Sequence, residues 1–207
     1  MLLAVQLLGI LIYPFAGDTR GGRALVSVFG IVVLGLVVRT IRATPALTWL
    51  SLLLGLPAMV LLIIQAVTGS DDLLPWSAAL EAVLYFYAAG ALIAYIAADH
   101  DITRDELYAV GATFTLVAWA FAYTFIVCQA IEPGSFVIGA DTADRSWLEL
   151  LFLSFTTLTS TGLSDIVPGQ DFARSLVMIE QLAGLGYVVM LVSRVVALTV
   201  VGRVPRT

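Results

Sequence analysis

A hydroxyl-rich segment, SFTTLTSTGLSDIVP, runs from Ser154 to Pro168 and lies between two of the longest apolar stretches of the chain. Seven of its fifteen residues carry a hydroxyl group, one carries a carboxylate, and Gly162 interrupts it. A buried polar group costs free energy unless it finds a partner, so this segment needs protein groups, water or a ligand around it. Its hydroxyl and carbonyl oxygens are of the kind that replace the hydration shell of a cation.

The composition of the chain is typical of a membrane protein with several spans. Hydrophobic residues make up 60% of the 207 residues, charged residues make up 12%, and the mean hydropathy is +1.02. Soluble domains carry about 25% charged residues, so a soluble domain is excluded. The formal net charge is −5, and all ten basic residues are arginines.

The inventory of reactive side chains does not favour an enzyme. Cys128 is the one cysteine and His100 the one histidine, so the sequence offers neither an internal disulfide nor a His/Cys metal cluster. A catalytic serine needs a base beside it, and His100 is expected in a loop on the opposite side of the membrane from Ser160. Asp165 and Glu180 lack the spacing of an aspartyl protease. We expect no catalysis, no cofactor, no bound metal other than a permeant cation, and no nucleic-acid partner.

Apolar runs separated by short charged links predict six membrane-spanning helices in an all-α fold. These helices are expected at Leu2–Ala16, Ala24–Val38, Leu47–Val67, Trp76–Ala98, Leu107–Ile131 and Phe172–Val201. The first two have fifteen residues, about 22 Å of helix, against a hydrocarbon core of about 30 Å. They must therefore extend into their flanks, lie in thinned bilayer, or pack without fully spanning. The short links make successive helices antiparallel neighbours.

A further helix that is too short to span is predicted between the fifth and sixth spans. Ser146 and Glu149 have the spacing of a capping box, and the apolar run after them continues to Thr159. This helix is about 21 Å long. Gly162 then breaks it, and Pro168 begins a path back to the same surface. The pattern predicts a re-entrant helix and loop, and non-helical backbone at membrane depth requires burial in protein or a water-filled path.

The segment from Ser154 to Pro168 resembles the motif SFTTLTTVGYGDIVP of the potassium channel superfamily at eleven of fifteen positions. The order of span, loop, short helix, loop and span over Leu107–Val201 is similar to the bacterial two-helix pore-domain (ion channel) family. The resemblance implies a pore domain at residues 101–207. Residues 1–100 are then a four-span amino-terminal membrane domain, so that the whole chain is a small six-span member with a divergent filter.

What the resemblance implies for function is a passive cation channel that conducts potassium. The residues at the positions of the family's T-V-G-Y-G filter are Ser160, Thr161, Gly162, Leu163 and Ser164. In the family, four such loops meet on one axis and their carbonyls replace the hydration shell of K⁺, so three further copies of the chain are the expected partners. Asp165 is expected behind the filter, with Thr156 as its hydrogen-bonding neighbour.

Two departures from the family motif predict weaker selectivity. Leu163 lacks the hydroxyl of the family's tyrosine, and Ser164 replaces a glycine that adopts positive φ. A non-glycine residue in that conformation costs roughly 1–2 kcal/mol per chain. The alternatives are therefore a weakly selective cation channel, or a non-conducting scaffold or accessory subunit with a vestigial pore loop.

The last span carries four further candidate residues. Gly184 and Gly186 are placed to form a gating hinge, or alternatively to let this span pack closely against the pore helix. Glu180 lies one turn before Gly184 and either lines a cavity below the filter or forms a hydrogen bond with the pore helix. Arg194 is expected to reach the lipid headgroups, with a gating or lipid-binding role as the alternative.

The span Trp76–Ala98 contains no arginine or lysine, which excludes a voltage sensor built on an arginine ladder. Glu81, near the outer end of this span, is interpreted as interfacial. With the filter facing outwards, both termini and the pair Arg39 and Arg42 lie inside, and acidic residues collect outside, where they attract cations. The resemblance implies a multi-pass protein of the cell membrane, specifically a bacterial inner membrane.

Overall fold

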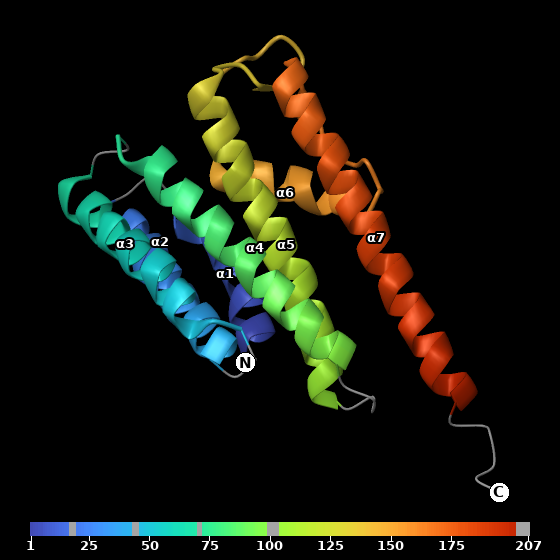
Figure 1. Ribbon diagram of the computed structural model, residues 1–207. Helices are drawn as coiled ribbons and strands as arrows, with labels where there is room; N and C mark the ends of the chain where they lie inside the picture. The colour runs from blue at the N-terminus through green and yellow to red at the C-terminus, as the bar shows by residue number, and fades with distance from the viewer. Residues whose placement is uncertain (17–19, 43–45, 70–71, 99–103, 202–207) are drawn as a thin grey trace, which may run out of the picture.

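The computed structural model describes residues 1–16, 20–42, 46–69, 72–98 and 104–201, and the protein is all-α apart from one short two-stranded sheet. Figure 1 shows the elements in chain order from blue to red. They are α1 (Leu2–Ala16), α2 (Arg20–Arg42), α3 (Thr48–Thr68), α4 (Leu74–Ala98), α5 (Arg104–Ile131), β1 (Phe136–Val137), α6 (Trp147–Leu158), β2 (Val167–Pro168) and α7 (Asp171–Val201).

The apolar runs predict most helix boundaries to within three residues, and α1 has the predicted bounds. The helix α2 is longer than its apolar run, with 23 residues and not fifteen, and it extends into the flanks on both sides, as one of the alternatives for this short run predicts. Its apolar run ends at Val38, but arginine is a good helix former, so the helix continues through the charged flanks to Arg42. An apolar run therefore marks the part of a helix suited to hydrocarbon, and helical hydrogen bonding extends beyond it.

Four helices in the described residues are long and apolar enough to cross a membrane. They are Thr48–Thr68, Leu74–Ala97, Tyr108–Ile131 and Asp171–Arg194. α1 is a shorter apolar helix. That α1 and α2 also cross remains a prediction.

The short helix α6 lies across the space between α5 and α7, as Figure 1 shows. The amino terminus and the end of α7 lie at one end of the molecule, whereas the loops that hold β1 and β2 lie at the other. α6 packs against both α5 and α7, and neighbouring helices from α1 to α5 pack in sequence order.

One hydrophobic core joins the amino-terminal helices to α5 and α6. Its fully buried members include Leu34 of α2, Leu84 of α4, Trp119 of α5 and Leu151 of α6. α6 is therefore held in place partly by helices outside the predicted pore domain. The predicted boundary between residues 100 and 101 lies outside the described residues.

Candidate functional site

The start of α6 is fixed by the predicted capping box, which the structure confirms. The backbone N–H of Glu149 donates to Ser146 Oγ at 3.4 Å, and the backbone N–H of Ser146 donates to Glu149 Oε2 at 2.7 Å. Two N–H groups that the first helical turn leaves unpaired thus gain acceptors.

Replacing Ser146 by alanine is expected to lower the free energy of unfolding by about 1 kcal/mol, the usual cost of losing such a cap. Chemical denaturation of the purified protein in detergent measures this change. Ser175→Ala is the matched control, because the exposed Ser175 hydroxyl donates only to Asp171 O within its own helix. Equal effects of the two substitutions would contradict a specific role for the cap.

The loop that leads into α6 is held by a pair of hydrogen bonds that the sequence did not reveal. Gln129 near the end of α5 donates from Nε2 to Arg145 O at 2.9 Å and accepts the Arg145 backbone N–H at 3.0 Å. Both residues are buried. The amide of Gln129 therefore fixes the position of the backbone directly before the cap of α6.

The Arg145 side chain adds an ion pair to this loop. Its guanidinium lies 2.9 Å from Asp141 Oδ2, and its Nε donates to Ala143 O at 2.7 Å. The backbone N–H of Ala143, which donates to Asp141 Oδ1, and then the Arg145 guanidinium lower the pKa of the Asp141 carboxyl. A lowered pKa means that the ion pair stabilises the loop at neutral pH and that this stabilisation is lost as the pH falls through the lowered value.

A Schellman motif ends α6 and begins the predicted filter. The Thr161 N–H donates to Thr156 O at 2.9 Å, and the Ser160 N–H donates to Thr157 O at 2.9 Å. Ser160, with φ +58°, occupies the left-handed position that usually carries glycine. The Gly162 N–H also reaches Thr156 O, at 3.2 Å, and Gly162 has φ +63°. The predicted break at Gly162 therefore begins two residues earlier.

The residues from Ser160 to Leu163 are exposed in the single chain, and Leu163 is 76% exposed. Ser164 does not have the positive φ of the family's glycine: among non-glycine residues that the structure describes, Ser160 alone has that conformation. Ser164 Oγ instead accepts the Ile166 N–H at 3.1 Å, which closes a turn that a serine makes without strain. The conformational cost of a left-handed non-glycine residue therefore falls on Ser160 and not on Ser164.

The chain returns from this loop to the end of the molecule where the loop before α6 lies. Ile166 is buried, and β2 pairs with β1 in antiparallel register, with Phe136 opposite Pro168. The Gly169 N–H donates to Ser135 O at 2.8 Å. α6 and the predicted filter are therefore clamped at both ends by groups outside the loop itself.

The hydrogen bond predicted between Asp165 and Thr156 is not formed within the described part of the chain. The Thr156 hydroxyl donates to Leu153 O of its own helix at 2.9 Å, and the Asp165 side chain is exposed. The physical reason is local: a threonine inside a helix has a backbone carbonyl one turn back within reach. Thr156 supports the loop through its carbonyl oxygen, which the two N–H groups described above share.

Of the two positions left open for Glu180, the structure places its carboxyl group against α6. Glu180 is fully buried, and its Oε1 forms a short hydrogen bond with Ser154 Oγ. Ser154 Oγ also lies 2.8 Å from Ala118 O of α5. A serine has one proton to donate, so a carboxyl group that keeps its own proton lets Ser154 donate to Ala118 and accept from Glu180. The three residues join α5, α6 and α7.

Gly184, one turn after Glu180, lies directly against the end of α6. A Cβ atom built on Gly184 would be 2.1 Å from Leu158 O and 2.8 Å from its carbonyl carbon. At Gly186, by contrast, an added Cβ would meet nothing within 4 Å. Tyr187, also on α7, contacts α5 instead, by donating to Val110 O at 2.7 Å. α7 is helical through this region. Arg194 lies ten residues after Gly184 on the same helix and is partly buried.

A largely half-buried aromatic cluster beside α6 was also missed. Trp147 at the start of α6 packs against Tyr13, Trp119 and Tyr123, with ring centroids 5.0–6.0 Å apart. Glu81 is 1% exposed and forms a hydrogen bond with Tyr123, so its interpretation as an interfacial residue is wrong. The aromatic rings exclude water from this carboxyl group, and the spacing of Glu81 in its own helix gave no signal of that contact.

Comparison with protein families gives a match for this arrangement. Residues 112–201 match the family model described as "Ion channel". The matched region covers most of α5, all of α6 and the predicted filter, and α7. Comparisons with curated proteins and with solved structures give no match.

Proposed function

We propose that this chain conducts potassium passively through a filter made by Ser160–Ser164 of four copies, because residues 112–201 match the ion channel family model and the segment Ser154–Pro168 resembles the filter motif of the potassium channel superfamily. The family indicates a membrane-embedded channel and not an enzyme. We further propose that the conducted ion is potassium and that four copies form a homotetramer. Each chain crosses the membrane six times, α6 enters it without crossing, and the membrane is the cell membrane of a bacterium.

The observation that carries the proposal is the exposed backbone that follows the capped end of α6. Thr161 and Gly162 place their N–H groups on Thr156 O, which leaves the carbonyl groups of the loop available for a ligand. The carboxyl end of a helix carries a partial negative charge, so the end of α6 at Leu158 stabilises a cation nearby. These features favour a cation over an anion.

The acidic residues around the loop support the same choice of ion. Asp144 and Asp165 are exposed. Asp141 and Asp171 are exposed too, but each is paired with an arginine, Arg145 and Arg174 respectively. The unequal pairing leaves a net negative charge near the loop in each copy, which raises the local concentration of cations.

The exposure of α7 supports the tetramer. In an apolar 18-residue stretch of Asp171–Arg194 only 17% of the residues are buried, compared with 61% in such a stretch of Tyr108–Ile131. Large apolar side chains on α7 remain exposed in the single chain, among them Met178, Ile179, Leu182, Leu185, Val189 and Val192. One loop cannot surround an ion, and four copies provide both a closed filter and partners for part of this surface.

Bi-ionic reversal potentials of the purified protein in planar bilayers test the proposal. We expect cation current with K⁺ preferred over Na⁺, and a mass in native-like lipid equal to four chains. A stable monomer or dimer would contradict the tetramer. A tetramer that passes no ions in liposomes would instead support the scaffold alternative.

A further inference from the structure

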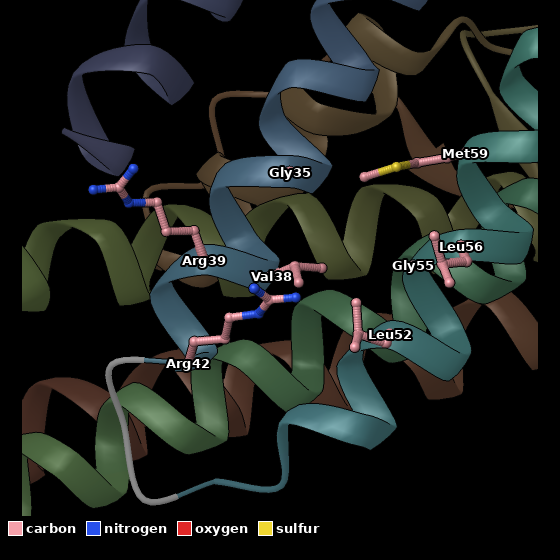
Figure 2. Close-up of a pocket in the computed structure, with 8 residues that line it drawn as sticks. All are labelled: Gly35, Val38, Arg39, Arg42, Leu52, Gly55, Leu56 and Met59. Atoms are coloured by element: carbon pink, nitrogen blue, oxygen red, sulfur yellow. The ribbon is translucent and has the colours of Figure 1, made fainter.

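A groove of about 460 Å³ opens between α2 and α3, outside the region that matches the channel family. α2 contributes Val38, Arg39 and Arg42 to its lining, and α3 contributes Leu52, Leu56 and Met59. Figure 2 shows these side chains together. The start of α3 lies near the amino terminus, at the end of the molecule opposite the loops that hold β1 and β2 (Figure 1).

Two glycines give the groove its shape. Gly55 of α3 is buried, and an added Cβ there would be 3.1 Å from Val38 Cγ2, so the helices are close at this point. At Gly35 of α2 an added Cβ would meet nothing within 4 Å. The two helices therefore touch at Gly55 and leave an open space beside Gly35.

The charged end of the groove carries two arginines. In Figure 2 the guanidinium of Arg42 extends back toward Val38 and the groove, whereas the Arg39 side chain extends in the other direction. Both residues are exposed. Neither forms an ion pair in the described part of the chain, where the two ion pairs found are those of Arg145 and Arg174. Arginines near the end of a helix interact favourably with its dipole, but that interaction leaves their guanidinium N–H groups available.

We propose that this groove binds one phospholipid with an anionic headgroup. The Arg42 guanidinium donates to the phosphate in the bidentate manner suited to its planar shape, and Arg39 adds positive charge at the rim. An acyl chain lies along Leu52, Leu56 and Met59. A free phosphate ion would leave this apolar part of the groove unused, whereas a phospholipid uses both parts. The volume is within the range of sites that hold small molecules.

The position of the groove suits this ligand. The membrane supplies lipid to α3, whose large side chains Leu53, Leu56 and Val60 are exposed. Anionic lipids are enriched in the cytoplasmic leaflet, and Arg39 and Arg42 lie at the end of the molecule away from the filter. The proposed lipid site does not depend on which ion passes through the filter, because the groove lies outside residues 112–201.

Titration of the full chain with phosphatidylglycerol, followed by native mass spectrometry, tests the proposal. Phosphatidylcholine with the same acyl chains and sodium phosphate are the comparison ligands. Arg42→Gln is expected to weaken phosphatidylglycerol binding by about tenfold, the effect of losing one charge-assisted contact. Gly35→Leu is expected to weaken it to a similar degree by filling the open space while both arginines remain.

Arg174→Gln is the matched control, because it removes one exposed arginine at the opposite end of the molecule. We expect it to leave phosphatidylglycerol binding unchanged. Wild-type affinity in both Arg42→Gln and Gly35→Leu would overturn the proposal, as would equal binding of phosphatidylcholine. Binding of sodium phosphate that Arg42→Gln removes and Gly35→Leu leaves intact would identify a free-anion site and also overturn it.

Discussion

Replacing Gly184 by alanine is expected to displace the end of α6 and to abolish conduction in reconstituted protein. The added Cβ would lie 2.1 Å from Leu158 O, a backbone atom that cannot rotate away. Alanine favours a helix by roughly 1 kcal/mol over glycine, but overpacking of a close contact costs roughly 1–3 kcal/mol in each chain and more when backbone must move. The same clash occurs in each copy. Because Leu158 lies two residues before Ser160, a displaced Leu158 also displaces the start of the filter.

Gly186→Ala is the matched control for this prediction. An added Cβ at Gly186 meets open space, so alanine there is expected to raise the stability by up to about 1 kcal/mol and to leave ion flux intact. Thermal unfolding and ion flux into liposomes measure both variants. Gly184→Ala protein with wild-type stability and flux would show that the close contact with α6 is unimportant.

The alternative role of Gly184 as a gating hinge makes a different prediction. A hinge predicts that Gly184→Pro, in well-folded protein, bends α7 and raises flux. A packing role predicts that proline, which also carries a Cβ, disturbs the end of α6 as alanine does. The sign of the change in flux therefore distinguishes the two roles.

Restoring the family residues at the upper end of the filter, with Leu163→Tyr and Ser164→Gly together, is expected to increase the preference for K⁺ over Na⁺. Leu163 is exposed, so a tyrosine ring has room, and its hydroxyl supplies the anchor that leucine lacks. Ser164→Gly removes the turn in which Ser164 Oγ accepts the Ile166 N–H and permits positive φ. Selectivity needs several consecutive sites held in one geometry or field strength.

The expected size of the change in K⁺/Na⁺ preference follows from the hydrogen bond that the tyrosine hydroxyl gains. One such hydrogen bond contributes roughly 0.5–1.5 kcal/mol, and four copies act on the same filter. We therefore expect a change of about tenfold in the permeability ratio. Bi-ionic reversal potentials measure it. The control is Leu163→Phe with Ser164→Gly, which adds the ring without the hydroxyl and is expected to gain less. An unchanged ratio in the tyrosine variant would mean that neighbouring groups already hold the upper filter.

Local features of the fold were predictable from sequence because they depend on residues a few positions apart. The capping box at Ser146 and Glu149 is an example, since its hydrogen bonds join residues three positions apart. Apolar run length likewise predicted the helices. It marked only the central part of α2, because helix formation and burial in hydrocarbon are different properties and arginine supports the first without the second.

The conformation of the filter was predicted only in part. The motif identified Ser160–Ser164, but positive φ belongs to Ser160 and not to Ser164 in this structure. The residue that becomes left-handed is decided by where α6 ends and by which N–H groups then need an acceptor. A comparison of motifs, residue by residue, contains no information about that hydrogen bonding.

The partners of Glu81, Gln129, Glu180 and Gly184 were decided by the tertiary structure alone. From sequence, Glu180 was compatible both with a water-filled cavity and with a contact to α6, the second being favoured slightly, and Glu81 was assigned to the interface. The hydrophobic effect that packs these helices is non-directional, so apolar periodicity does not specify which turn of one helix meets which turn of another. Ser154 meets Glu180, and Leu158 meets Gly184, because α6 lies across the space between α5 and α7.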